Sequence, residues 1–168
     1  MHESLGQMGE YLMRRLSHYP IKYKIEKEQL EIETDIPSLF NVLSFLQMDT
    51  HCAFEQLMDL CAVSRKGGWE IIYTLLSVEH NQRLRLIVVG PEGAIVPSVG
   101  NIYRNSPWFE REIWDLFGVL FSGHEDLRRI LMEAGFEGHP LRKDFPLRGL
   151  QKEEQKNNKK KTKEGQSW

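Results

Sequence analysis

The stretch from Val99 to Gly149 constrains the fold of this chain more than any other segment. It combines charged, aromatic, glycine and proline residues more densely than a helix core or a surface loop normally needs. Charged residues there stand directly beside bulky apolar ones, as in Glu110-Arg111-Glu112-Ile113-Trp114. Charges in apolar surroundings must be paired and hydrogen-bonded with good geometry. The pattern therefore predicts a segment that is buried against another protein.

Length and charge exclude several classes of protein. A chain of 168 residues, 40% of them hydrophobic and 27% charged, is sized for one globular domain. No apolar run of about 18 residues is present, so no membrane span is expected. The N-terminus resembles neither a signal nor a transit peptide, so we expect a chain that works where it is made or has already lost a presequence. Residues 151–168 carry a local charge of +3, which leaves −5 on residues 1–150. An acidic body with a short lysine-rich tail is not typical of a nucleic-acid-binding domain.

The first part of the chain alternates between helical and strand-like periodicity. Apolar spacing predicts a helix over residues 4–18 and a second helix that begins at Asp35-Ile36-Pro37. Alternating residues predict a hairpin of 21–25 and 30–33, and three further strands at 56–63, 69–78 and 83–89. The expected fold class is α+β, with an antiparallel or mixed sheet and helices on one face.

After Gly93 the pattern changes. Ser106-Pro107 is typical of a helix start, and the helix has an apolar face that extends to Leu120 and a second face with Trp108, Arg111, Glu112 and Asp115. Glycines and prolines beyond Gly123 allow at most one short helix, at 127–134, within an extended, loop-rich arm. We therefore divide the chain into an α+β body (1–98), a signature helix with a docking arm (99–149) and a lysine-rich tail expected to be disordered (150–168).

The clustered carboxylates favour a structural role over a catalytic one. Glu110 and Glu112 lie two positions apart on the predicted helix, so they point roughly 200° away from each other and cannot share a proton. Arg111 and Asp115 have the i, i+4 spacing of an ion pair. We therefore predict a network of ion pairs and no catalytic residue.

The sequence also offers no convincing metal or cofactor site. His124-Glu125 resembles the start of a zincin motif, but Arg128 stands where the second histidine is needed. Cys52 and Cys61 are too few for an iron–sulfur cluster. The glycines of 90–93 lack the lysine and the helix of a phosphate-binding loop. We therefore expect no metal, NADH, flavin or quinone to be bound by this chain.

Three blocks in register carry a resemblance to a known family. They read W-x-E-R-E-x-x-D-x-F-G-V-x-F from Trp108, G-H-x-D-L-R-R-I-L from Gly123, and G-F-x-G-H-P-L-R-K-D-F-P-L from Gly135. The stretch resembles the thirty-kilodalton (NuoC-type) subunit of respiratory complex I, NADH:quinone oxidoreductase. Glu125 departs from that family, in which proline is usual. Family members also generally continue past P-L-x-G, where this chain changes to Gln151-Lys152, so we expect other subunits to cover that groove.

The resemblance implies a non-catalytic, cofactor-free structural subunit of the peripheral arm of complex I. Such a subunit packs against the large, 49-kilodalton-type quinone-site subunit and other peripheral-arm subunits, in a complex that uses FMN, iron–sulfur clusters and a quinone for electron transfer coupled to proton translocation. The implied location is the matrix side of the mitochondrial inner membrane or, alternatively, the cytoplasmic face of a bacterial membrane. The residues expected at the partner interface are Trp108, Glu110, Arg111, Glu112, Asp115, Phe117, His124, Asp126, Arg128, Arg129, Phe136, His139, Arg142, Lys143, Asp144 and Phe145.

Three alternatives stay open at this point. The first is the related small subunit of a membrane-bound, energy-converting hydrogenase. The second is a small acid–base hydrolase that would use Glu110, Glu112, Asp115 and His124, which helical geometry opposes. The third is an RNA-binding module led by the lysine-rich tail, which lacks the glycine-aromatic sequence of common RNA-binding sheets.

Overall fold

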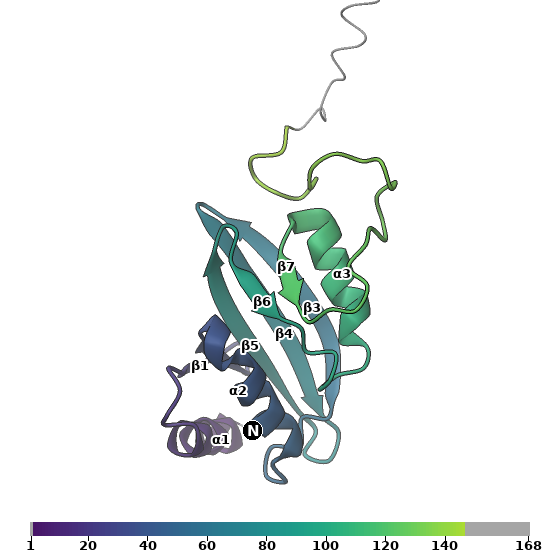
Figure 1. Cartoon of the computed structure of the whole chain (residues 1–168). Coiled ribbons are helices and arrows are strands. Elements are labelled where there is room, and N and C mark those ends of the chain that lie inside the picture. Colours follow the sequence, from purple (N-terminus) through teal and green to yellow (C-terminus); the bar gives the residue numbers. More distant parts are fainter. Residues whose placement is uncertain (1, 147–168) are drawn as a thin grey trace, which may run out of the picture.

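The computed structural model describes residues 2–146 and shows an α+β fold with helices over a sheet (Figure 1). In chain order its elements are α1 (His2–Arg15), β1 (Lys22–Glu26), β2 (Gln29–Thr34), α2 (Ile36–Met48), β3 (Gln56–Arg65), β4 (Gly68–Ser77), β5 (Gln82–Pro91), β6 (Ile95–Pro97), α3 (Ser106–Phe117) and β7 (Leu120–Ser122). Among these residues no helix is both long and apolar enough to cross a bilayer.

Five strands form a mixed sheet in the order β1-β2-β5-β4-β3. Neighbouring strands run antiparallel except β2 and β5, which are parallel, with Leu30 opposite Leu84. The β1–β2 hairpin is tighter than the sequence predicts, because Glu26 already pairs with Gln29. Its two turn residues, Lys27 and Glu28, have φ angles of 48° and 62°, which is typical of the tight turns that match strand twist.

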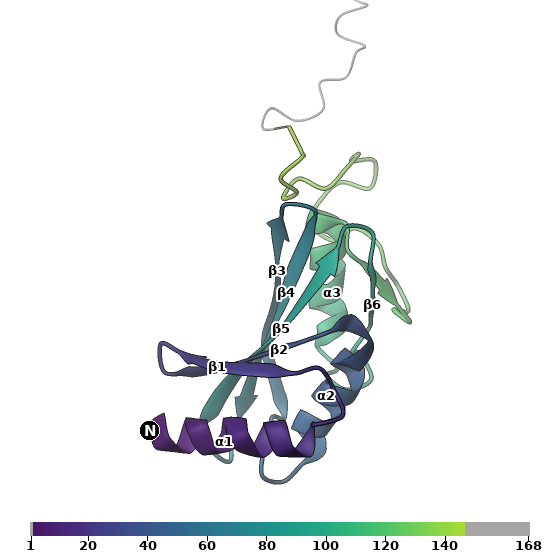
Figure 2. The same ribbon diagram turned by 90° about the vertical axis from the view of Figure 1, so that its left-hand side faces the viewer.

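The hydrophobic core lies between one face of this sheet and the helices. Side chains of β4 alternate between buried and half-buried positions, and the buried set of β4 packs beside that of β5. Helices α1 and α2 contribute Leu12 and Leu43 to the same core. Figures 1 and 2 show α2 and α3 on one side of the sheet, with α1 beneath β1 and β2. The prediction of an α+β fold with helices on one face is confirmed.

Polar residues fix the ends of α2 and its contact with α1. The Asp35 side chain accepts a hydrogen bond from the Ser38 backbone N–H at 3.0 Å, which caps the first turn. Asp49, just after the last turn, accepts the Tyr11 hydroxyl of α1 at 3.0 and 3.1 Å. Helix α1 is therefore attached to the end of α2 by a polar contact as well as by apolar packing.

A second, two-stranded sheet positions α3, and the sequence does not predict it. Strands β6 and β7 are parallel, with Val96 opposite Phe121. Leu120, expected on the apolar face of the helix, instead lies in β7 and is exposed, because α3 ends at Phe117. Gly118 follows with a φ of 77°, a left-handed conformation that ends a helix without steric cost for glycine.

The segment 123–146, here called the arm, contains no helix or strand. The predicted short helix at 127–134 is therefore wrong. In Figure 2 the arm lies on the same side of the sheet as α3. The lysine-rich tail expected to be disordered (150–168), like residues 147–149 of the predicted arm, lies outside the described residues.

Candidate functional site

Helix α3 divides the charged residues of the signature into an inner and an outer set. Glu110 and Asp115 are fully buried within this chain. Trp108 is 62% exposed, and Arg111 and Glu112 are half-buried. The two sets do different work: the inner carboxylates hold the local structure, and the outer side chains form an accessible surface.

Glu110 joins α3 to the loop that precedes it. Its carboxylate accepts hydrogen bonds from the Ser98 hydroxyl at 2.6 Å, the Val99 backbone N–H at 2.8 Å and the Ser106 hydroxyl at 3.1 Å. A buried carboxylate is tolerated when several donors surround it. Glu110 therefore shapes the loop 98–106 from inside, and we do not expect its carboxylate to contact a partner directly.

Asp115 organises the first half of the arm. One carboxylate oxygen accepts the backbone N–H groups of Ile130, Leu131 and Met132 at 3.0, 2.8 and 2.9 Å, and the other accepts Arg129 Nη1 at 2.6 Å. Burial alone would raise the pKa of Asp115, but these four donors outweigh it and lower the pKa to about 2. Asp115 is therefore ionised at neutral pH and acts as the internal anchor of the arm.

Arg129 completes this anchor from the side of the arm. Its Nη2 donates to the carbonyls of Phe136 at 2.6 Å and Gly138 at 3.0 Å. The guanidinium also lies 5.6 Å from the ring centroid of Trp114 and 5.7 Å from that of Phe136. A single side chain thus replaces, for this part of the arm, the hydrogen bonds that a helix or a sheet would supply.

The predicted ion pair between Arg111 and Asp115 is wrong, because Arg129 occupies Asp115. Arg111 instead donates to the carbonyls of Arg128 at 3.2 Å and Arg129 at 3.3 Å, and it stacks 5.8 Å from the ring centroid of Trp108. The same contacts explain why 127–134 forms no helix. Its backbone donors point to Asp115 and two of its carbonyls point to Arg111, so they are not available to each other.

The two histidines of the signature fasten loops to α3. The His124 ring lies 3.0 Å from the Pro107 carbonyl through Nε2, and its Nδ1 accepts the Asp126 backbone N–H at 3.0 Å. His139 places Nδ1 3.0 Å from the Asp115 carbonyl. In residues 2–146, no group of three or more His, Cys, Asp and Glu residues is arranged to hold a metal ion.

Gly118 is the position where the arm approaches α3 most closely. A Cβ atom at this residue would lie 2.6 Å from Cδ2 of the His139 ring. The positive φ and this contact both require glycine. Nearby, the Leu141 backbone N–H donates to the Leu116 carbonyl at 3.0 Å, so the arm returns to the last turn of α3.

The end of the arm is attached to the body. Arg142 pairs with Asp144 at 2.9 Å and with Glu92, which precedes β6. The Lys143 backbone N–H donates to the Ser64 hydroxyl of β3 at 3.3 Å. The rings of Phe136 and Phe145 stack with their centroids 5.9 Å apart. The predicted arm residues are therefore held together by this chain itself.

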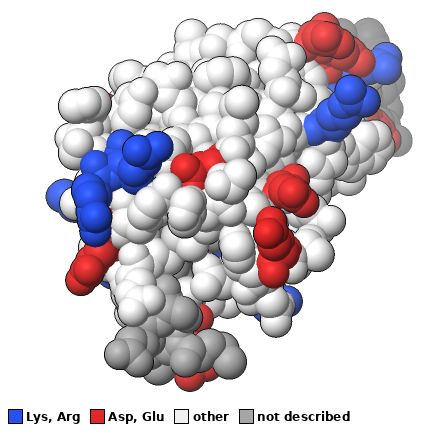
Figure 3. Space-filling view, turned by 90° about the horizontal axis from the view of Figure 1, so that it is seen from below, with Lys and Arg blue, Asp and Glu red and all other residues white. Residues whose placement is uncertain are grey.

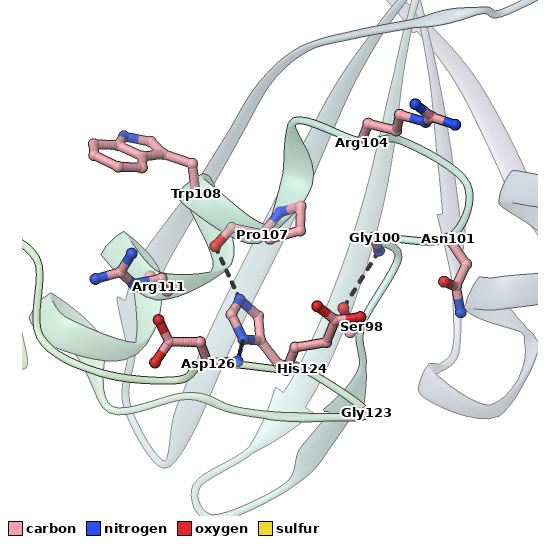
Figure 4. Close-up of a pocket in the computed structure, with 11 residues that line it drawn as sticks. Ser98, Gly100, Asn101, Arg104, Pro107, Trp108, Arg111, Gly123, His124 and Asp126 are labelled. Atoms are coloured by element: carbon pink, nitrogen blue, oxygen red, sulfur yellow. Dashed lines mark hydrogen bonds between the residues drawn. The ribbon is translucent and has the colours of Figure 1, made fainter.

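Between α3 and the start of the arm lies a cavity of about 490 Å³. Trp108 and Arg111 stand on one side of it, Arg104 and Asn101 on the other, and His124 and Asp126 form its floor (Figure 4). Trp and Arg are the side chains most enriched at the energetic centres of protein interfaces. The arrangement is suited to binding a protein surface.

The structure also shows residues that the sequence analysis missed. Ser98 and Ser106 supply donors to Glu110, Trp114 stacks on Arg129, and Arg104 lines the cavity without an ion pair in the part of the chain that the structure describes. A serine at a helix start was visible as a cap, but nothing in the sequence indicated that its hydroxyl would bind Glu110. Among the predicted interface residues Arg128 is exposed and pairs with Asp126 at 2.9 Å.

The remaining electrostatic features do not indicate a nucleic-acid or cluster site. Seen from below, acidic and basic side chains form small scattered groups on a mainly uncharged surface (Figure 3). Burial raises the pKa of the Cys52 thiol to about 12, so it carries no thiolate at neutral pH. Cys61 is exposed on β3, on the other side of the sheet from the core.

Comparison with known proteins gives consistent matches. Residues 32–151 match the family model described as respiratory-chain NADH dehydrogenase, 30 Kd subunit. The chain is 44% identical over 153 residues to the C subunit of NADH-quinone oxidoreductase of Paramagnetospirillum magneticum, covering 89% of this chain and 77% of that protein. It is 43% identical to the mitochondrial NADH dehydrogenase [ubiquinone] iron-sulfur protein 3 of Candida albicans, covering 88% of this chain and 54% of that protein.

A solved structure shares the fold over almost its whole length. A chain of the membrane-bound sulfane sulfur reductase, an archaeal respiratory membrane complex, superposes with a TM-score of 0.70 and is 26% identical, covering 93% of this chain and 92% of that one. The body, α3 and the arm therefore occur together in a relative that is part of a membrane-bound assembly.

Proposed function

The chain belongs to the family of the 30-kDa subunit of respiratory-chain NADH dehydrogenase, and we propose that it serves there as a cofactor-free docking subunit. It is a subunit of an enzyme complex and not a complete enzyme. In the proposal, the surface of α3 and the arm binds the large, 49-kilodalton-type subunit that helps to form the quinone site. FMN, the iron–sulfur clusters and the quinone would be bound by other subunits.

The observation that carries this proposal is the contrast between the arm's order and its exposure. The arm has no regular structure, yet Asp115, Arg129 and Arg111 fix its backbone through seven hydrogen bonds to N–H groups and carbonyls of residues 128–138. Trp108 and Leu131 are 62% and 56% exposed beside it. Ordering an exposed loop in advance lowers the entropy cost of binding. The arrangement supports a surface preformed for a partner.

The chemistry of the chain supports a structural role. Two cysteines, one of them buried and protonated, cannot supply the thiolates of an iron–sulfur cluster. The hydrolase hypothesis fails on geometry, because Glu110 and Asp115 are enclosed by donors from their own chain. The relatives at 42–44% identity are named as complex I subunits, which favours that complex over an energy-converting hydrogenase.

We also propose a peripheral location at the membrane. The relatives include bacterial proteins and a mitochondrial one. A peripheral position on the matrix side of the mitochondrial inner membrane, or on the cytoplasmic side of a bacterial membrane, fits an assembly subunit of this family.

The test is incorporation of variants into the complex. Membranes carrying Trp108→Ala or Arg111→Ala should contain less assembled NADH:quinone oxidoreductase on native gels, while the isolated variant chains keep their folded circular dichroism spectrum. Met48→Ala is the matched control, because Met48 is 79% exposed at the end of α2, away from α3 and the arm. Normal assembly of both α3 variants would contradict the docking role of this surface.

A further inference from the structure

The main sheet has a second face that the described residues leave uncovered. We define the open face by the outward side chains of β3, β4 and β5 that follow one another in register: Cys61, Val63, Ile72, Thr74, Leu76, Ile87 and Val89. The helices and the arm lie on the opposite side, where the buried side chains of these strands point (Figure 2). Val89 is 54% exposed and Cys61 is exposed.

The sequence of these strands is that of strands buried on both faces. A sheet with one solvated face normally alternates apolar and polar residues. Here β4 contains the run Ile71-Ile72-Tyr73 and the pair Leu75-Leu76, and β5 contains the run Leu86–Val89. Ile72 stands directly opposite Ile87 across the two strands, and opposite Cys61 on β3. The inward residues are covered by the core, whereas the outward aliphatic residues have no cover within residues 2–146.

Charges at the margins of the open face indicate the polarity of what covers it. Glu33 lies beside Ile87 on β2, and Asp59 lies two residues before Cys61 on β3; both are exposed and neither forms an ion pair within residues 2–146. Lys22, opposite Glu33 in the register, has no ion pair in the same described range. By contrast, Glu31 is already neutralised between Lys24 at 3.0 Å and Arg85 at 3.4 Å. The acids beside the aliphatic centre are therefore available to a basic partner group.

The tail of the chain is not suited to provide this cover. Residues 151–168 contain no aliphatic side chain and are rich in lysine, glutamine and asparagine. Such a segment can meet carboxylates but cannot bury isoleucine and valine.

From these observations we propose that the open face is a second protein interface, separate from α3 and the arm, which binds another subunit of the same assembly through an aliphatic surface flanked by lysine or arginine. The inference rests on membership of the assembly, as proposed above, but not on which residues of α3 or the arm make contact. It makes this chain a connecting block with partners on two opposite sides.

Cys61 provides a direct test in the unmodified protein. Both cysteines are alkylated with N-ethylmaleimide in the native complex and in the isolated full-length chain, and cleavage after Glu55 separates their peptides for mass spectrometry. We expect Cys61 to react in the isolated chain and to react at least an order of magnitude more slowly in the complex, since an interface core excludes solvent. Buried Cys52 should stay unreacted in both and reports unfolding.

Substitutions test the chemistry of the partner. Val89→Lys and Asp59→Lys should leave the isolated chain monomeric and folded but reduce its incorporation severalfold, whereas the exposed control positions Met48→Lys and Glu79→Lys should not. Equal alkylation of Cys61 in an intact complex would overturn the inference while leaving the docking role of α3 untouched. Self-association of the isolated chain that Val89→Lys abolishes would also overturn it, because the partner would then be a second copy.

Discussion

The Asp115 carboxylate and the Arg129 guanidinium form an ion pair of 2.6 Å that is almost withdrawn from solvent, with side-chain exposures of 0% and 14%. Asp115 belongs to α3, and Arg129 belongs to an arm without secondary structure. The pair therefore determines whether the arm is ordered, and four properties of the protein that depend on it or on its neighbours can be measured.

Removal of Arg129 should release the arm without unfolding the body. Arg129→Ala leaves a buried carboxylate without its cation, a change that costs about 3–5 kcal/mol for a broken buried pair. Because the arm can open on its own, we expect amide exchange of residues 130–132 to accelerate by roughly a hundredfold or more, with little change in β4. Arg128→Ala is the control, since that side chain is 72% exposed. A matching loss of protection in β4 would show that arm and body unfold together.

The attachment of the arm should depend on acidic pH. The pKa of Asp115 falls from 3.8 to about 2 in the folded chain, so the folded form holds fewer protons than the unfolded form between these values. Its contribution, about 2 kcal/mol, is complete above about pH 4 and is lost as the pH falls toward about 2. Fluorescence of Trp114, which stacks on Arg129, should report the loss. Asp115→Asn should flatten this transition; an unchanged pH profile in that variant would assign it to another group.

Substitution of Gly118 should destabilise the junction of α3 and the arm. Gly118→Ala places a side chain at a φ of 77° and within 2.6 Å of the His139 ring. Backbone strain of this kind costs about 1–3 kcal/mol. Urea denaturation should show the loss, and His139→Ala in the Gly118→Ala background should recover the part due to the ring contact. Complete absence of recovery would mean that the backbone conformation alone is responsible.

Glu110 should matter for folding before it matters for assembly. Glu110→Ala leaves the donors of Ser98, Val99 and Ser106 without an acceptor in a buried position. We expect a loss of about 3 kcal/mol in the free energy of unfolding, or roughly 6–12 °C in Tm for a chain of this size. Glu112→Ala, two residues away and half-buried, should change Tm little. Equal effects of the two substitutions in a thermal melt would contradict the internal role of Glu110.

Local periodicity was sufficient for most of the fold. The start of α3 at Ser106, the α2 start at Asp35 and the strands β3 to β5 follow from capping residues and from alternation, and the family resemblance is confirmed by the matching model. The parallel pairing of β2 with β5 was not predictable in this way, because α2, β3 and β4 lie between them in sequence. Strands β6 and β7 have three residues each, too few for a recognisable period.

The site was predicted in its residues and less well in its contacts. The spacing of Arg111 and Asp115 suggested a pair within one helix, but an arginine fourteen positions beyond Asp115 occupies the carboxylate. Helical spacing gives the neighbours that a side chain can reach on its own helix and says nothing about a loop that folds back. The helix predicted at 127–134 failed for the same reason, since its backbone groups bond to Asp115 and Arg111.

The direction in which Asp115 acquires its partners has a consequence for synthesis of the chain. Every donor to its carboxylate lies after it in the sequence, between Arg129 and Met132, and the carbonyls bound by Arg129 lie later still. As the polypeptide leaves the ribosome from its N-terminus, α3 can form on the finished sheet before the arm emerges. Each new stretch then meets an acceptor or donor that is already in place. The arm can be laid down in order of translation, without waiting for residues still to be made.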